Sequence, residues 1–254
     1  MDITLSKADG ILTIGFNRPA RKNAITSVMY QSMADALLDG EADAAVRVIL
    51  LTGAAEIFTA GNDLEDFIKN PPAGANSPVV RYMMALSGAT KPVVAAVSGA
   101  AVGIGTTLLM HCDLVYAAQN AKFSMPFTQL GLCPEFASSL LLPRLAGYHR
   151  AAEKLMLGEP FSVAEAQAMG LVNQVLPLDE LLPYATSQAA KLAALPASSI
   201  RMTKQLMKSA QQAEIGAVMI KEMQHFGQLL QTPEAKEAFQ AFFEKRKPDF
   251  TQFA

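Results

Sequence analysis

Cysteine and histidine are scarce in this chain of 254 residues. The two cysteines, Cys112 and Cys133, lie in apolar surroundings without CxxC spacing, which favours inert thiols in a reducing compartment over a disulfide framework. The three histidines are isolated, and the sequence has neither an HExxH motif nor a Gly-x-Ser-x-Gly elbow. These absences argue against a zinc site and a serine-hydrolase triad, and no metal or redox cofactor is expected.

The chain also lacks charge runs and long apolar segments. Its formal net charge is -2, its pI is about 5.9, and lysine and arginine are scattered, so no face for nucleic acid is expected. No apolar run reaches the ~20 residues of a membrane span, and the N-terminus has no basic stretch followed by an apolar core. The last residues, Thr-Gln-Phe-Ala, differ from a peroxisomal Ser-Lys-Leu signal. We therefore expect a soluble cytoplasmic protein with no membrane partner.

What the sequence does contain is an alternation of strand and helix patterns. Hydrophobic residues make up 51% of the chain, enough for one large domain or for one domain with a helical annex. Two strand patterns, Ile3–Ala8 and Ile11–Phe16, flank Asp9-Gly10, which predicts a type I′ hairpin. Further strands are expected at 46–52, 93–97 and 114–118, and helices after Thr26 and at about 79–86 and 105–110. This pattern predicts an α/β fold with a largely parallel sheet, followed from Glu135 by a mostly helical region.

Two segments stand outside this alternation. Residues 70–78 contain three prolines and one glycine, which predicts a mobile loop. Glu234–Arg246 carries a wide aromatic stripe at helical spacing. Such a stripe must be buried, either on the core of its own chain or as a subunit contact or lid over the ligand of a neighbour. The sequence leaves both alternatives open.

Glycines mark the ends of two apolar strands, within Phe58–Leu64 and Ser98–Gly105. Such turns aim backbone N–H groups into a cleft, and Gly103-Ile104-Gly105 also precedes a helix whose N-terminus carries positive potential. A glycine pair of this kind more often serves close packing alone, and without a full GxGxxG motif or a Walker lysine no NAD or ATP site is expected. If the two turns converge at the carboxyl edge of one sheet, their N–H groups can hold the enolate formed next to a thioester carbonyl.

Enolate chemistry needs a base, and Glu135 is the strongest candidate. Apolar neighbours on both sides predict poor hydration, which raises the pKa of a carboxyl group. Pro134-Glu135 fits the first turn of a helix equally well, where the helix dipole lowers the pKa of an acid, and the sequence does not decide between the two. The other acids near the turns are expected in structural or solvated roles; they are Asp63, Glu65, Asp66 and Asp113.

At this point the motifs resemble those of the crotonase superfamily, the enoyl-CoA hydratase and isomerase group. The resemblance covers nearly the whole chain, and its specific segments are Phe16–Pro19 with Asn23-Ala24, Phe58–Leu64, Lys91–Gly99, Cys112–Leu114, Ala166–Val172 and Phe243–Phe250. It implies a crotonase-like spiral of ββα units over residues 1–195 and a helical C-terminal region, 196–254, that forms trimers, often paired into hexamers.

The resemblance also implies a substrate and its contacts. The substrate is an acyl-CoA, so coenzyme A is part of the substrate and no separate cofactor is expected. The thioester oxygen is held by the backbone N–H groups of Asn62 and Ile104. The adenine end of CoA lies against the turn around Ala60 and Asp63, where Gly61 and Leu64 also belong to the CoA site, and the loop with Arg21, Lys22 and Ala24 supplies basic or backbone contacts.

Within this family, the positions of the carboxylate side chains indicate which reaction to expect. Hydratases of this family use two glutamates, and Thr107 and Phe127 occupy those positions here. The segment Met125–Ser139 instead resembles Δ3,Δ2-enoyl-CoA isomerases, in which a single glutamate, here Glu135, removes a proton from C2 and returns it at C4. Phe136 replaces a usual glycine, which is expected to narrow the acyl pocket or alter chain-length preference. The alternatives are hydration by Glu135 alone, another crotonase reaction, or a non-catalytic acyl-CoA-binding protein.

Overall fold

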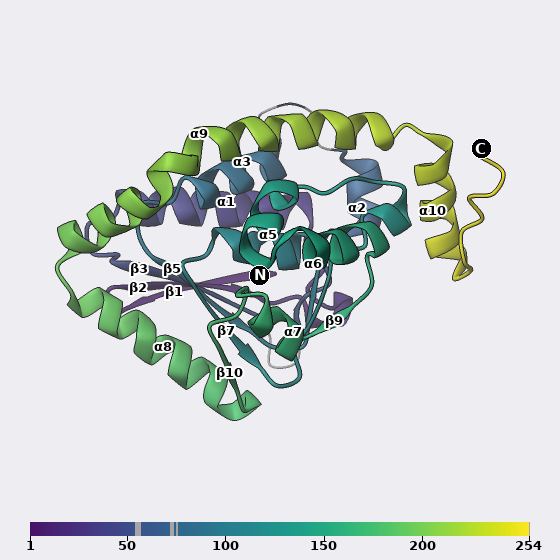
Figure 1. The fold of residues 1–254 in the computed structure, drawn as a ribbon. Coiled ribbons are helices and arrows are strands. Elements are labelled where there is room, and N and C mark those ends of the chain that lie inside the picture. The colour runs from purple at the N-terminus through teal and green to yellow at the C-terminus, as the bar shows by residue number, and fades with distance from the viewer. Residues whose placement is uncertain (54–56, 72–73, 75, 254) are drawn as a thin grey trace.

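The computed structural model describes residues 1–53, 57–71, 74 and 76–253, and its larger sheet has six strands (Figure 1). Residues 72, 73 and 75 of the expected mobile loop lie outside the described residues. The strand order is β1 (Ile3–Ala8), β2 (Ile11–Phe16), β3 (Val48–Thr52), β5 (Val93–Val97), β7 (Leu114–Ala118) and β10 (Gln174–Leu176). Among the described strand pairs of this six-stranded sheet only β1 and β2 are antiparallel, so the expectation of a largely parallel sheet is confirmed.

The predicted hairpin and strands agree closely with the structure. Asp9 and Gly10 have φ angles of 51° and 77°, as a type I′ turn requires. The strand expected from residue 46 begins at Val48 instead, because the N–H groups of Arg47 and Val48 both donate to Gly10 O (2.7 and 3.1 Å) before the regular ladder starts. The helix expected at 105–110 is divided into α4 (Ile104–Thr107) and a 3₁₀ turn, Leu108–His111.

A second, four-stranded sheet gives the fold its repeating pattern. Its order is β4 (Ile57–Thr59), β6 (Ala100–Val102), β8 (Lys122–Ser124) and β9 (Phe161–Ser162). Three times in succession, a strand of the larger sheet is followed by a strand of the smaller sheet and then by helical structure. The helices after these pairs are α2 (Leu64–Lys69) with α3 (Pro78–Ser87), α4, and α5 (Ser138–Ala146). This is the expected spiral of ββα units.

Helices cover both faces of the larger sheet because successive side chains of each strand point to opposite faces. Ile49 and Leu51 lie in one buried cluster with α1 (Ser27–Ala42) and α3. Val48 and Leu50 lie in a second cluster against α8 (Leu178–Ala194). The remaining short helices are α6 (Tyr148–Ala152), a π-helical turn (Glu153–Leu157) and α7 (Val163–Ala168).

The C-terminal part consists of two helices that cross the rest of the chain. Figure 1 shows α9 (Ala197–Leu229) running along the side of α3 and α5, and α10 (Pro233–Glu244) lying at its far end. The boundary after residue 195 falls between α8 and α9, and the division of the chain there stays a prediction. Over the described ranges, no helix combines the length and apolar character needed to cross a membrane.

Candidate active site

The turn after β4 is fixed by hydrogen bonds to residues 22–25. Ile25 N donates to Gly61 O (2.8 Å), and Asp63 N donates to Ile25 O (2.9 Å). In this parallel bridge the N–H group of Asn62 points away from Ile25, because its two neighbours make the bridging bonds. Gly61 has φ of +84°, and a Cβ atom there would lie 2.6 Å from Val102 O. Only glycine therefore allows this turn to lie so close to the end of β6.

The second turn begins α4. Gly103, with φ of +56°, is its N-cap residue, and Gly103 O accepts hydrogen bonds from the N–H groups of Thr106 and Thr107 (2.9 and 3.0 Å). Ile104 is the first helical residue, so its N–H group has no carbonyl partner within the helix. Because β4 and β6 are parallel neighbours, the two turns meet at the carboxyl edge of the smaller sheet. The expected convergence of the two turns is confirmed.

Glu135 lies in the segment that joins the 3₁₀ turn Thr128–Leu130 to α5, and it is only 7% exposed. Its Oε1 atom has no hydrogen-bond partner among the described residues. Its backbone carbonyl accepts from the N–H and hydroxyl groups of Ser138 (3.1 and 2.6 Å), which fixes the backbone from which the carboxyl group projects. The carboxyl group therefore has a free acceptor atom in a site nearly closed to solvent.

The sequence left open whether Glu135 is a poorly hydrated carboxyl group or part of the first turn of a helix, and the structure decides between these two interpretations. Helix α5 begins at Ser138, so Glu135 does not occupy a first helical turn and that alternative is wrong. The helix starts later because Phe136 and Ala137 have left-handed φ angles of 60° and 55°. Burial is the main cause that raises the pKa of Glu135 to about 8, and the nearby charge of Glu222 adds to it. A carboxyl group with such a pKa is suited to take up and release protons near neutral pH.

The phenyl ring of Phe136 packs in the core. It stacks on His111 with ring centroids 3.9 Å apart, and His111 Nε2 donates to Phe136 O (2.8 Å). Tyr82 lies on another side of the ring, with centroids 6.5 Å apart. The ring is 1% exposed and does not belong to the lining of the cavity described below. The replacement of the family's glycine therefore does not narrow this cavity directly, because the side chain is directed into the core.

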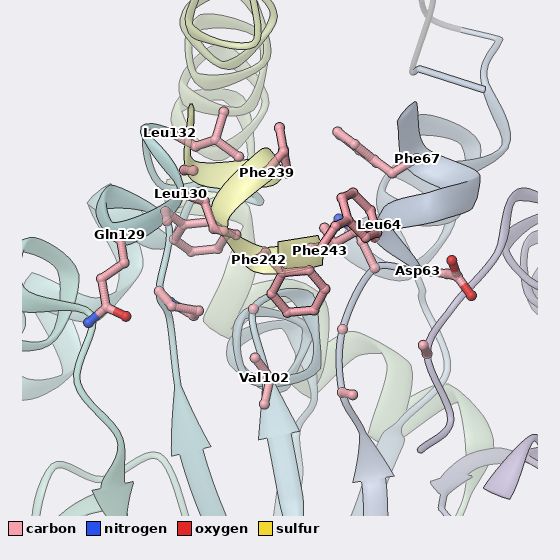
Figure 2. A pocket seen from close by; sticks show the side chains of 18 of the residues that line it. Asp63, Leu64, Phe67, Val102, Gln129, Leu130, Leu132, Phe239, Phe242 and Phe243 are labelled. Atoms are coloured by element: carbon pink, nitrogen blue, oxygen red, sulfur yellow. The ribbon is translucent and has the colours of Figure 1, made fainter. Parts of the chain in front are cut away.

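A cavity of about 870 Å³ brings together all ten residues singled out from the sequence. They are Arg21, Lys22, Ala24, Ala60, Gly61, Asn62, Asp63, Leu64, Ile104 and Glu135. Figure 2 shows the other side of the cavity, where apolar side chains from the smaller sheet, α2, the segment near residue 130 and α10 gather; among them are Leu130, Leu132, Phe239, Phe242 and Phe243. Of the two hydratase positions, Phe127 lines the cavity and Thr107 is fully buried. The cavity thus joins two N–H turns, the buried carboxyl group of Glu135 with its unpartnered Oε1 atom, and a largely apolar wall.

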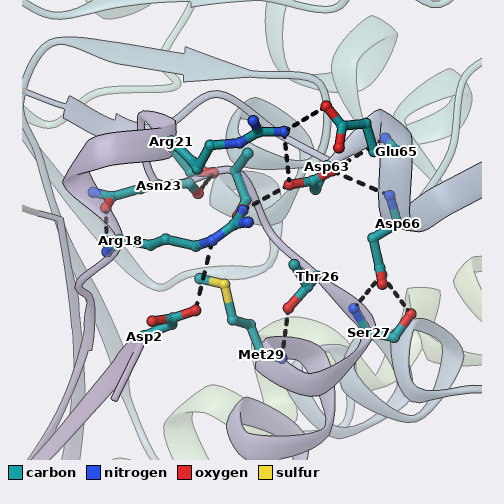
Figure 3. A network of polar contacts seen from close by, with 12 residues as sticks. Asp2, Arg18, Arg21, Asn23, Thr26, Ser27, Met29, Asp63, Glu65 and Asp66 are labelled. Carbon is teal, nitrogen blue, oxygen red and sulfur yellow. Dashed lines mark hydrogen bonds and ion pairs between the residues drawn. The ribbon is translucent and has the colours of Figure 1, made fainter.

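Asp63 and Arg18 lock the loop that carries Arg21 onto the first turn (Figure 3). Arg18 Nη1 donates to Asp63 Oδ2 (2.7 Å) and to Ala24 O (3.0 Å). Asp63 Oδ1 accepts from the first N–H groups of α2, those of Glu65 and Asp66 (both 3.1 Å). Burial acts to raise the pKa of Asp63, but these hydrogen bonds and the arginine charges outweigh it and lower the pKa. The expectation of a structural role for this carboxylate is confirmed.

Several residues at the site carry no local signal in the sequence. Tyr30, from α1, donates its hydroxyl to the side-chain oxygen of Asn62. Glu222, from α9, lies beside Glu135. Arg246 and Lys247 line the cavity after α10, next to its aromatic residues. Arg246 and Lys247 stand at the end of the aromatic stripe, so their place near its aromatic residues can be read from the sequence. Tyr30 and Glu222 reach the site only through the packing of distant helices.

The aromatic stripe packs largely on its own chain. Ala235, Ala238 and Phe239 are buried, and a Cβ atom at Gly131 would lie 2.8 Å from Ala235 N, so the start of α10 is in close contact with that turn. Phe242 and Phe243 remain 57% and 44% exposed while they line the cavity. The alternative of packing on the chain's own core is confirmed for the buried residues, and α10 also forms a wall of its own chain's cavity.

The described residues contain no group of three or more His, Cys, Asp or Glu side chains that could hold a metal ion. The thiols of Cys112 and Cys133 are free, and burial is the main cause that raises their pKa values, to about 12 and about 11. Such thiols are predominantly protonated at neutral pH and are poor nucleophiles.

Comparison with known proteins agrees with this architecture. The enoyl-CoA hydratase/isomerase family model matches residues 6–253. The chain is 32% identical over 250 residues to 2,3-dehydroadipyl-CoA hydratase of Escherichia coli, covering 98% of both chains. It is 37% identical over 222 residues to enoyl-CoA delta isomerase 2 of Rattus norvegicus, covering 85% of this chain and 56% of the relative.

The solved structures show the same relationship in three dimensions. The enoyl-CoA hydratase/isomerase from Pseudoalteromonas atlantica has a TM-score of 0.94 to this structure at 39% identity, covering 99% of this chain and 100% of that one. A match of this length and similarity includes both the spiral core and the C-terminal helices. The two N–H turns, the apolar cavity and the family match together show that the chain belongs to the enoyl-CoA hydratase/isomerase family, the crotonase superfamily.

Proposed function

We propose that this enzyme is a Δ3,Δ2-enoyl-CoA isomerase, which converts a 3-enoyl-CoA into the conjugated 2-enoyl-CoA. The observation that carries the proposal is the single unpartnered carboxyl group of Glu135, buried in the same cavity as the two N–H turns. The hydratase pair of carboxylates has no counterpart at Thr107 and Phe127. One carboxyl group suffices for an isomerase, because the same proton that leaves the substrate is returned to it.

In the first step the thioester oxygen accepts hydrogen bonds from the N–H groups of Asn62 and Ile104. The ionised carboxylate of Glu135 removes a proton from C2, so the C2–H bond breaks and its electrons pass into a dienolate spread over the thioester and the C3–C4 double bond. Each preorganised donor aimed at such a developing charge commonly contributes ~3 kcal/mol. The apolar wall of the cavity excludes water and makes these interactions stronger.

In the second step the protonated Glu135 returns the proton to C4. The double bond is then between C2 and C3, in conjugation with the thioester, and Glu135 is again ionised. No cofactor is required, because the reaction moves one proton and no electrons leave the substrate. The basic side chains at the cavity, including Arg21 and Lys22, are suited to the phosphates of CoA.

The decisive assay follows two substrates separately. Purified protein is incubated with trans-3-hexenoyl-CoA and with trans-2-hexenoyl-CoA, while absorbance of the conjugated thioester and product mass are recorded. The proposal predicts a gain of conjugation from the 3-enoyl substrate without a change in mass. Addition of one water to the 2-enoyl substrate would instead show a hydratase that uses Glu135 alone. Binding of acyl-CoA without turnover of any substrate would show a non-catalytic protein.

The variant Glu135→Gln tests the assigned residue. It preserves size and removes the acid–base function, so we expect turnover to fall by about three orders of magnitude or more while CoA affinity changes little. Circular dichroism and a CoA-binding titration check that the variant is folded. Near-normal isomerisation by the folded variant would contradict the role of Glu135.

We also propose that the enzyme is cytoplasmic, on the sequence grounds given above, and that it assembles as a homotrimer or a dimer of trimers. The family resemblance supports the assembly, as do large apolar side chains that stay exposed on the single chain. These include Tyr148 (65% exposed), Met156 (63%), Leu206 (70%) and Met207 (66%).

A further inference from the structure

A second carboxylate lies behind Glu135. Glu222 projects from the last third of α9 and is only 6% exposed. It accepts hydrogen bonds from Ala137 N (2.5 Å), Ser139 N (3.0 Å) and the Ser139 hydroxyl (2.5 Å). All three donors belong to the few residues that follow Glu135 in the chain. Glu222 is therefore the link between a distant helix and the backbone that carries the proposed base.

The backbone at this point needs such a link. Phe136 and Ala137 are two consecutive non-glycine residues with left-handed φ angles, a strained conformation for residues that carry a Cβ atom. The N–H group of Ala137 is donated to Glu222 rather than to a helix carbonyl, so removal of the carboxylate leaves a buried donor without a partner. The strained segment is held by Glu222 on one side and, through Phe136 O, by His111 on the other.

We propose that Glu222 is the positioning residue of Glu135: it holds the strained segment that presents the Glu135 carboxyl group to the cavity, and it places a second, hydrogen-bonded carboxylate behind that group. As a statement about catalysis the inference rests on the proposed function, since it assigns Glu135 as the base. Glu222 itself is not among the residues that line the cavity, and it acts on the reaction only through Glu135.

The charges around the two carboxyl groups support this division of roles. Burial raises the pKa of Glu222 above its ordinary value, and three hydrogen bonds from Ser139 and Ala137 oppose this by favouring the ionised form. No partner is found for Glu135 Oε1 within the described part of the chain. Across the same described part, no lysine or arginine forms an ion pair with either group, so the Glu222 charge is not cancelled. Tyr30 lies near Glu135, and Cys133 lies near both carboxyl groups; burial is the main cause that raises the pKa of each, so both are neutral at neutral pH.

The consequence for chemistry is a stronger base. A like charge nearby disfavours ionisation of Glu135 and so raises its affinity for a proton. Because Glu135 must be ionised to take the C2 proton, kcat/KM is expected to rise with pH through the pKa of this group. Removing the Glu222 charge lowers that pKa, so the rising limb of the profile must move to lower pH.

The experiment compares Glu222→Gln with a matched control, Glu214→Gln. Glu214 lies on the same helix and contacts the same partner, α5, but through an exposed pair with Arg144 (2.7 Å). In the full-length protein labelled with 13C at the glutamate carboxyl groups, the Glu135 signal, assigned with Glu135→Gln, is titrated by NMR without substrate. We expect its pKa to fall by about one unit or more in Glu222→Gln and to stay unchanged in Glu214→Gln.

The kinetic arm uses trans-3-hexenoyl-CoA. In Glu222→Gln the rising limb of kcat/KM moves to lower pH by the same shift, and kcat on the plateau falls at least about tenfold while KM changes little. The variant Glu222→Asp keeps the carboxylate but has a side chain too short to make the same hydrogen bonds. We therefore expect the rising limb of its kcat/KM profile to stay near the original pH while kcat falls. This variant also serves if Glu222→Gln does not fold, because an unchanged kcat in Glu222→Asp would overturn the positioning role.

The two arms separate this inference from the proposed function. If the wild-type enzyme does not isomerise the substrate, the proposed function fails, yet the NMR titration still decides whether Glu222 sets the proton affinity of Glu135. An unchanged Glu135 pKa in folded Glu222→Gln overturns the inference even when the wild type is an active isomerase. A shifted pKa with unaltered kcat and unaltered pH profile overturns its catalytic part.

Discussion

At the scale of single residues, Glu135 is held where its charge is disfavoured, and this has a consequence for stability as well as for catalysis. Its pKa is about 8 in the folded chain, against 4.5 for an ordinary glutamate. Between these values the unfolded chain loses the proton while the folded chain keeps it. The folded state thus binds more protons, and the contribution of Glu135 to the free energy of unfolding falls as pH rises from about 4.5 to about 8.

We therefore expect Glu135→Gln to be more stable than wild type at pH 8.5 and equally stable at pH 4.5. Glutamine never ionises, so it avoids a cost of several kcal/mol, at most about 5 kcal/mol from the pKa difference. Chemical denaturation at both pH values measures the effect. Equal unfolding free energies of the two proteins at pH 8.5 would contradict the raised pKa.

The site residues that could be predicted from the sequence share one property. Asn62, Ile104 and Glu135 each stand inside a short motif whose neighbours in the chain define the local backbone. Tyr30 and Glu222 have no such context, because their role depends on packing of α1 and α9 against residues 32 or more positions away in the chain. The contacts of Tyr30 and Glu222 with the site can be recognised only in the three-dimensional structure.

At the scale of elements, the glycine turn at Gly61 is the feature on which the two N–H groups depend. Substitution Gly61→Ala introduces a Cβ atom 2.6 Å from Val102 O at a φ of +84°. We expect a loss of about 2 kcal/mol or more in the free energy of unfolding, together with a large fall in kcat as the turn moves away from Gly103.

The control for this variant is Gly216→Ala. Gly216 lies inside α9, and a Cβ atom there meets nothing within 4 Å. Alanine at this position is expected to stabilise the protein by roughly 0.5–1 kcal/mol through its higher helix propensity. Urea denaturation of both variants provides the comparison, and a Gly61→Ala protein as stable and active as Gly216→Ala would show that the turn tolerates a side chain.

The elements themselves differ in how far their bounds were predictable. The strands Ile3–Ala8, Ile11–Phe16, Val93–Val97 and Leu114–Ala118 agree with the sequence pattern to the residue, because each is a short alternating or apolar segment next to turn residues. The start of α5 does not agree. Left-handed backbone at Phe136 and Ala137 has no local signature, since neither residue favours it and distant side chains impose it.

At the scale of the whole molecule, the property to measure is the number of chains in the assembly. The family resemblance predicted both the spiral of ββα units, now seen in the two sheets, and a trimer. We expect light scattering coupled to gel filtration to give three or six times the chain mass of 27.1 kDa. A particle of one chain mass at micromolar concentration would contradict the trimer and would leave the exposed apolar side chains without a partner.

The cavity has a further consequence for such an assembly. Both glycine turns, Glu135 and the aromatic wall of α10 belong to one and the same polypeptide. We expect an inactive subunit to remove only its own share of turnover when it joins active ones. In genetic terms, a missense allele that replaces Glu135 without unfolding the chain would be recessive. Enzyme activity would follow gene dosage, and inactive subunits would not inhibit their wild-type partners.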